Sequence, residues 1–248
     1  MEEKKGILYI VATPIGNLGD MTLRALETLK AVDVVLSEDT RVTGNLLRHF
    51  EIKKPLISFH EHTENDKAMK LVERMKAGEN MALVTDAGTP GISDPGNVLV
   101  ALAAEKGVRI IPIPGASALG AIVSVAGIDM REFVFKGFPP HKKGRQTFFQ
   151  SVAESTIPVI YYESPHRVVK NLELLLELAP EKHLVLGREL TKIFEEVVRG
   201  SVSEVKAYLE SKVGKMKGEF TMIVYSGTKE MAPTKETNKK ARHALHAS

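Results

Sequence analysis

The sequence contains no cysteine, and its charges of opposite sign nearly cancel. The missing cysteine excludes a disulfide scaffold, a thiolate zinc site, an iron–sulfur cluster and a cysteine nucleophile. The 34 Lys and Arg residues against 31 Asp and Glu residues give a net charge of only +3. Any affinity for an anionic partner must therefore come from local patches rather than from overall charge.

The sequence also lacks a recognisable membrane span or targeting signal. Its first residues, MEEKKG, are charged and have no apolar stretch of the kind found in signal peptides. Residues 110–128 carry no formal charge, but they include Pro112, Pro114 and three glycines. A span needs about 20 mainly apolar residues. We expect a soluble, cytoplasmic protein in which this stretch forms a buried strand, a turn and a small-residue helix.

Several short catalytic and binding motifs are absent as well. There is no Walker A phosphate loop, no GxGxxG fingerprint after the first strand, no GxSxG nucleophile motif and no HExxH zinc motif. The sharpest metal-like cluster is His60-Glu61-His62. We interpret it as a polar loop after a strand and expect no metal site.

Short apolar runs separated by helical patterns predict an α/β fold. Continuous apolar strands of this kind are typical of a parallel sheet that is covered by helices on both faces. The predicted strands of the first half are 8–12, 32–36, 56–59, 81–84 and 108–113.

Three segments rich in glycine and proline follow strands of this predicted sheet, at residues 13–20, 86–96 and 114–117. In open α/β sheets, ligands bind outside the carboxyl ends of the strands, so these segments predict a pocket. Residues 86–96 hold three glycines, two prolines and two aspartates. Backbone N–H groups here fit a carboxylate or an adenine edge. The alternative is a rigid turn that only packs.

The second half has strand patterns at 133–135, 158–162, 184–186 and 220–225. Ser164-Pro165 predicts the start of a helix that ends near residue 178, since proline suits the first helical turn. We therefore predict two α/β domains and a disordered tail. Their predicted bounds are 1–117, 118–227 and 228–248.

Six segments resemble, in the same order, the ribosomal RNA small subunit methyltransferase I family, whose fold is of the tetrapyrrole methylase type. The resemblance covers residues 6–226, and six ordered segments are far more specific than any single loop. The segments are Thr13–Asp20, Ser37–Arg41, Asp86–Gly96, Pro114–Ser117, Tyr162–Arg167 and Gly187–Lys192.

This resemblance implies two α/β domains with S-adenosyl-L-methionine in the cleft between them. It implies methylation of the ribose 2′-oxygen of a cytidine in the decoding region of 16S ribosomal RNA. The partner would be the small ribosomal subunit in the cytoplasm, and proteins of related fold are homodimers. The implied cofactor-binding residues are Pro14, Asp86, Ala87, Gly88, Thr89, Pro90, Ile92, Ser117, Ala118, Glu163, Leu190 and Thr221.

A hydroxyl that attacks a sulfonium methyl group must also lose its proton, so a base is required. Among the carboxylates of the six segments we predict Glu189 or Glu38 as this base, ahead of Asp39 and Glu163. Arg188 is the predicted cation beside the reacting oxygen. In the alternative interpretation, residues 37–41 are a capped helix start with an internal ion pair, and Arg188-Glu189 is an interdomain salt bridge.

RNA contacts are expected from basic residues interleaved with planar side chains. The alternative is a solvated basic loop. Two other functions remain open: a methyltransferase of the same fold that acts on a small molecule such as a tetrapyrrole, and an RNA-binding module without catalysis. The predicted RNA-contacting residues are Arg41, Phe138, His141, Lys142, Lys143, Arg145, Tyr161, His166 and Arg167.

Overall fold

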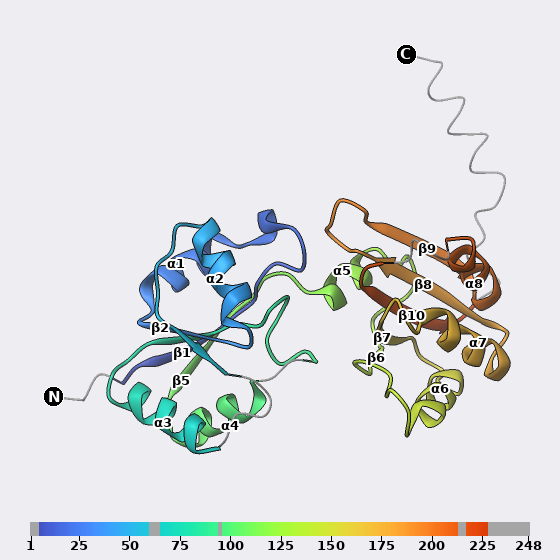
Figure 1. The fold of residues 1–248 in the computed structure, drawn as a ribbon. Helices are drawn as coiled ribbons and strands as arrows, with labels where there is room; N and C mark the ends of the chain where they lie inside the picture. Colours follow the sequence, from blue (N-terminus) through green and yellow to red (C-terminus); the bar gives the residue numbers. More distant parts are fainter. Residues whose placement is uncertain (1–4, 60–64, 94–95, 213–216, 228–248) are drawn as a thin grey trace, which may run out of the picture.

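The computed structural model describes residues 5–59, 65–93, 96–212 and 217–227. It consists of two α/β domains, each built on its own five-stranded sheet, which lie side by side (Figure 1). The predicted tail at 228–248 and the His60-Glu61-His62 cluster lie outside the described residues.

The sheet of the first domain is parallel, as predicted, with the strand order β3-β2-β4-β1-β5. β2 and β4 are completely buried, as expected of central strands where helices cover both faces of a sheet, whereas β3 and β5 at the edges are only partly buried. The strands are β1 (Ile7–Val11), β2 (Val34–Ser37), β3 (Leu56–Ser58), β4 (Met81–Leu83) and β5 (Arg109–Ile113).

Four helices cover this sheet, two on each face (Figure 1). On one face Leu29 and Leu47 are buried, and on the other Leu71 and Leu99 are buried, so each helix contributes an apolar stripe. The helices are α1 (Leu23–Ala31) and α2 (Thr40–His49) on the first face, and α3 (Asn65–Lys76) and α4 (Asn97–Glu105) on the second. A short 3-10 helix, η1 (Leu18–Asp20), precedes α1.

The uncharged stretch 110–128 has the form expected of it. It contains the end of β5, a turn, and the short helix α5 (Ala118–Ser124), which is capped by the side chain of Ser117. Ile122 of α5 is fully buried against the second domain. Among the described residues, no helix is long and apolar enough to cross a membrane.

The second sheet is mixed, with the order β6-β7-β10-β8-β9. Only β6 and β7 run parallel, and the other neighbours are antiparallel. β9 was not predicted, and the last strand of the chain lies at the centre of the sheet. The strands are β6 (Val134–Phe135), β7 (Val159–Glu163), β8 (Lys182–Arg188), β9 (Glu196–Ser201) and β10 (Phe220–Ser226).

Helices α6 (Arg145–Ala153), α7 (Val168–Leu178) and α8 (Val202–Glu210) cover one face of this sheet, and α5 covers the other (Figure 1). The prediction that a helix begins at 164 is wrong: α7 begins at Val168. The Ser164 carbonyl accepts hydrogen bonds from the backbone N–H groups of Arg167 and Val168, so the chain makes a turn before the helix.

Candidate functional site

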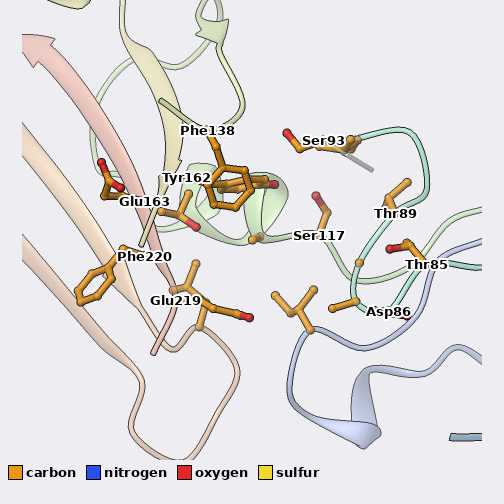
Figure 2. Close-up of a pocket in the computed structure, with 17 residues that line it drawn as sticks. Thr85, Asp86, Thr89, Ser93, Ser117, Phe138, Tyr162, Glu163, Glu219 and Phe220 are labelled. Carbon is orange, nitrogen blue, oxygen red and sulfur yellow. The ribbon is translucent and has the colours of Figure 1, made fainter. Parts of the chain in front are cut away.

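A cavity of about 240 Å³ lies between the two domains, beside the carboxyl ends of the first sheet's strands (Figure 2). This is just below the range of roughly 300–1,000 Å³ that is typical of small-molecule sites. Pro14 and Pro90 are buried nearby but do not line the cavity. The other residues named above for the cofactor all line it: Asp86, Ala87, Gly88, Thr89, Ile92, Ser117, Ala118, Glu163, Leu190 and Thr221.

The first two glycine-rich segments are joined by backbone hydrogen bonds. The Thr13 N–H donates to the Gly88 carbonyl at 2.9 Å, and the Gly88 N–H donates to the Thr13 carbonyl at 3.1 Å. Gly88 has φ +86°, and a Cβ atom at this position would lie 3.3 Å from Cγ2 of Ile15. Glycine therefore allows both the left-handed backbone and the close approach of the two loops.

Side-chain hydrogen bonds add further links between the loops. The Thr89 hydroxyl of the second loop donates to the Ala116 carbonyl of the third at 3.1 Å, and the Thr13 hydroxyl of the first loop donates to the carbonyl of Thr85, just before the second loop, at 3.1 Å. Ser117 caps α5 by accepting from the Gly120 N–H. These bonds join the described parts of the three loops into one wall of the cavity.

The opposite wall comes from the alternation of β10. Phe220 and Met222 pack under the helices, so Thr221 and Ile223 face α5 and the cavity side. The turn after β8 adds Leu190, which lies between two residues with positive φ, Glu189 at 50° and Thr191 at 69°. Such strain in non-glycine residues is typical of functional sites.

The turn after β8 reaches across to the first domain. Gly16 has φ +143°, and a Cβ atom there would lie only 2.3 Å from Cγ of Lys192. The aliphatic part of the Lys192 side chain therefore lies directly on the backbone of Gly16. This contact closes the cavity on the side of Ile15 and Leu190, each of which is 8% exposed.

Glu189 is held in an ion cluster and does not line the cavity. Its Oε1 accepts hydrogen bonds from Lys192 Nζ at 2.8 Å and from the Glu219 N–H at 3.0 Å. Burial alone would raise the pKa of Glu189, but these two bonds and the charges of Lys192 and Arg188 lower it overall. The role of Glu189 as a base stays a prediction, and its bonding favours a structural role.

Arg188 is also engaged. Its guanidinium donates to the Lys217 carbonyl through Nε and Nη2, at 3.0 and 2.8 Å, and to Glu196 at 3.2 Å. These partners all belong to the second domain, so the interdomain salt bridge considered above is wrong for Arg188.

Glu163 lines the cavity, but its carboxylate points away from it (Figure 2). It accepts from Asn171 Nδ2 at 2.5 Å and from the Ser164 N–H at 2.8 Å, and Nε of Arg167 lies 3.8 Å away. Burial raises the pKa of Glu163, although these three partners and the charge of Arg145 oppose the shift.

Residues 37–41 lie at the edge of the cavity, because the Asp39 N–H donates to Oδ1 of Asp86 at 3.0 Å. Asp39 caps α2 and pairs with Arg41 at 2.6 Å, which confirms the alternative of a capped helix start with an internal ion pair. The hydrogen bond from the Arg41 side chain, with backbone bonds and charge, lowers the pKa of Asp39 to about 2. Glu38 is exposed and does not line the cavity.

The structure does not bring all of the predicted RNA-contacting residues together. His141, Lys142 and Lys143 are exposed on the loop between β6 and α6, and Arg145 and Arg167 lie at the starts of the neighbouring helices. Arg41 is exposed on the first domain, and His166 on the turn before α7. Tyr161 is 1% exposed in the core of the second domain, so its prediction as an RNA contact is wrong.

Several lining residues were missed as cofactor contacts. Ser93 and Thr85 belong to or adjoin the glycine-rich loop, and Tyr162 belongs to a recognised segment, so the sequence carried a signal for them. Ile15 follows Pro14 in a recognised segment, so the sequence carried the same signal for it. Glu219 directly precedes β10 and lies within residues 218–221, which the family resemblance places near the adenine.

The cavity suits a cationic nucleoside such as S-adenosyl-L-methionine. The charged residues that line it, in the part of the chain that the structure describes, are Asp86, Glu163 and Glu219. Because the Glu163 carboxylate points away, the acidic character comes from Asp86 and from Glu219, which is paired with Lys192 at 3.2 Å. An acidic surrounding favours a sulfonium over an anion. Oγ1 of Thr85 is buried without a hydrogen-bond partner among the described residues. Ile15 and Leu190 offer apolar surface to an adenine ring.

Comparisons with known proteins agree with this geometry. Residues 7–206 match the family model of tetrapyrrole (corrin/porphyrin) methylases. The ribosomal RNA small subunit methyltransferase I of Synechocystis sp. is 48% identical, over 92% of this chain and 82% of that protein. The protein of the same name from Haemophilus influenzae is 46% identical, over 90% and 80%.

Solved structures share the fold at low sequence identity. Diphthine synthase has a TM-score of 0.68 at 17% identity, covering 90% of this chain and 91% of the other. Cobalt precorrin-4 methyltransferase has a TM-score of 0.65 at 18% identity, covering 88% and 94%. The sequence relatives, the family model and the fold lead to one conclusion: the chain belongs to the ribosomal RNA small subunit methyltransferase I family within the tetrapyrrole methylases.

Proposed function

We propose that the protein transfers a methyl group from S-adenosyl-L-methionine to the ribose 2′-oxygen of a cytidine in 16S ribosomal RNA, within the small subunit and in the cytoplasm. One observation carries the proposal: an acidic cavity between the domains opens beside an exposed loop that bears Lys142, Lys143 and Phe138. The acidic interior suits the sulfonium, and the basic loop suits a phosphate backbone.

When bound, the cofactor supplies an electrophilic methyl group on a positively charged sulfur. The protein's main task is then to align the ribose hydroxyl with that methyl group and to exclude water. The linked loops at Gly88, Thr89 and Ser117 hold the donor, while Leu190 and Thr221 cover it from the second domain.

We retain Glu38 as the candidate base. It is exposed, and the next residue, Asp39, is hydrogen-bonded to the cavity residue Asp86. A Glu38→Gln variant should lose kcat while keeping its affinity for the cofactor, whereas Glu189→Gln should show a stability defect first. Loss of kcat in Glu189→Gln alone, with an unchanged melting temperature, would reverse this assignment.

The direct test of the function is transfer of a tritiated methyl group to small subunits that lack the modification. We expect label in the RNA of assembled subunits, much less in naked RNA, and a single labelled ribose on mapping. Label in protein, or no label in either substrate, would contradict the proposal.

A tetrapyrrole substrate is the second candidate, since the structures of the same fold include a cobalt precorrin-4 methyltransferase. The acidic lining disfavours it, because a polycarboxylate would be repelled by Asp86 and Glu219. Methyl transfer to uroporphyrinogen but not to small subunits would favour this alternative. Absence of any cofactor binding in a calorimetric titration would favour the non-catalytic RNA-binding module.

We further propose a homodimer. Ile193 is 94% exposed and Phe194 is 73% exposed, next to each other on the turn after β8. Two large apolar side chains at this exposure are typical of a surface that contacts another molecule. Light scattering should give twice the chain mass, and Ile193→Asp should reduce it to one chain mass; a wild-type monomer would contradict the dimer.

A further inference from the structure

Phe138 and Tyr162 form an aromatic pair at the open side of the cavity (Figure 2). Their ring centroids are 5.3 Å apart, and Tyr162 also contacts Phe135 at 5.1 Å. Phe138 is nevertheless 54% exposed, although burial of such a ring is normally favourable. The ring is therefore supported from one side and open on the other.

The residues on either side of Phe138, Gly137 and Pro139, are both held by hydrogen bonds to their carbonyl groups. The Tyr162 N–H donates to the Gly137 carbonyl at 2.9 Å, and Nη1 of Arg167 donates to the Pro139 carbonyl at 3.2 Å. Pro139 is itself buried. A ring fixed in this way loses little conformational freedom when a ligand binds to it, so it is preorganised for binding.

The cavity has one closed end and one open end. Ile15 and Thr221, at the closed end, are 8% and 4% exposed. Phe138 and Ser93, at the other end, are both exposed, and Oγ of Ser93 lies so close to Gly137 that a Cβ atom there would be 2.9 Å away. A ligand that arrives from solvent meets Phe138 before it meets the closed end.

The charge around this ring suits a nucleotide. Lys142 and Lys143 follow Phe138 on the same exposed loop, and Arg145 starts the next helix. An aromatic face that takes a base, followed by cations that take the neighbouring phosphates, is the usual arrangement for single-stranded nucleic acid.

We propose that Phe138, supported by Tyr162, is the platform on which the base of the methyl-accepting nucleotide stacks after it leaves its neighbours in the RNA. The proposal rests on the proposed function and names the residue that receives the substrate base. Enzymes that act on a nucleotide within a structured nucleic acid commonly extrude it and read it by stacking. A base stacked on Phe138 has its ribose next to the opening of the cavity.

The test compares Phe138→Ala, Phe138→Leu and Phe138→Trp with the wild-type protein on unmethylated small subunits. Stacking of one base corresponds to roughly a 5- to 150-fold change in affinity. We expect kcat/KM to fall within that range for Phe138→Ala. Phe138→Leu should fall almost as far, because it keeps apolar contact but lacks an aromatic face, and Phe138→Trp should remain near wild type. Leu23→Ala, at a 79% exposed residue outside the cavity, is the control.

Two measurements separate the possible failures. Cofactor affinity, measured by calorimetry, should be unchanged within about twofold in all variants; a selective loss in Phe138→Ala would assign the ring to the cofactor and overturn the proposal. Unchanged kcat/KM in Phe138→Ala, or full rescue by leucine, would also overturn it while leaving the methyltransferase function standing. A wild-type protein that transfers no methyl group would contradict the proposed function itself.

Discussion

The buried pair of Glu163 and Asn171 gives the sharpest test of which carboxylates serve the fold and which serve the chemistry. Glu163 is 2% exposed and Asn171 is 1% exposed, and the carboxylate faces helix α7 rather than the cavity. Oδ1 of Asn171 is buried without a hydrogen-bond partner among the described residues. Replacing either residue should therefore change stability before it changes catalysis.

Asn171→Leu removes the donor to a buried carboxylate. Losing a hydrogen bond to a charged group costs about 1.5–3 kcal/mol, and removal of the unpaired Oδ1 offsets part of this cost. We expect a loss near 1.5 kcal/mol, which for a chain of this length is a drop in melting temperature of about 3–6 °C. Glu163→Gln should be at least as stable as wild type at pH 8, because its amide can donate to Oδ1 of Asn171.

The pH dependence gives an independent check. Burial raises the pKa of Glu163 in the folded state, so the folded state binds the proton more tightly than the unfolded one. The stability that the protonated Glu163 side chain contributes is fully present below the ordinary pKa of a glutamate. It is lost as pH rises through the raised pKa of the folded state. Asn171→Leu raises that pKa further, so its deficit should widen between pH 4 and pH 8.

Thermal unfolding across this pH range, together with methyl transfer at pH 8, shows whether Glu163 stabilises the fold or takes part in catalysis. Glu163→Gln should show no such pH effect and should keep its kcat within about threefold of wild type. If the stability difference between Asn171→Leu and the wild type does not change with pH, the raised pKa of Glu163 is refuted. Loss of methyl transfer in a stable Glu163→Gln protein would instead make Glu163 the base.

Three further predictions concern the cavity and its surroundings. Gly88→Val forces a side chain into a left-handed backbone, and it should weaken cofactor binding at least tenfold in a calorimetric titration while circular dichroism stays unchanged; retained affinity would mean that this loop does not hold the cofactor. Lys192→Ala removes a hydrogen bond that lowers the pKa of Glu189. The wild type loses the stability that comes from this lowered pKa as pH falls through the lowered value, and the variant should lose less stability over the same pH range. Identical acid unfolding curves for the two proteins would contradict the ion cluster at Glu189. Reversing the charges of Lys142 and Lys143 should weaken binding to small subunits and flatten its dependence on salt, whereas parallel salt curves would remove both lysines from the interface.

The first domain could be predicted well because its strands are short and mostly apolar, and β1 and β5 are also bounded by glycine or proline. Helix α2 was missed as a full element, because Thr40–His49 is polar on most of its surface. Strand β9 was also missed: Glu196–Ser201 has only two apolar residues in a row among charged and small ones, and it pairs with β8 alone. Both cases depend on tertiary contacts that local patterns do not contain.

The candidate site divides in a similar way. The loops around Gly88 and Ser117 could be predicted from sequence because backbone constraints select for glycine and proline. No residue type in the sequence indicates the direction in which a carboxylate points. In β7, Tyr161 and Glu163 share the face under the helices, whereas Tyr162 faces the cavity, and only the register with β10 reveals which is which.

The central position of β10 has a consequence for protein synthesis. Phe220–Ser226 is the last of the described strands to leave the ribosome, yet it hydrogen-bonds to both β7 and β8. A nascent chain that stops before this strand therefore has two unsatisfied strand edges and one wall of the cofactor cavity missing. The growing polypeptide should therefore be unable to hold a methyl donor until β10 has been translated, so premature stop codons even a few residues before 220 should behave as complete nulls.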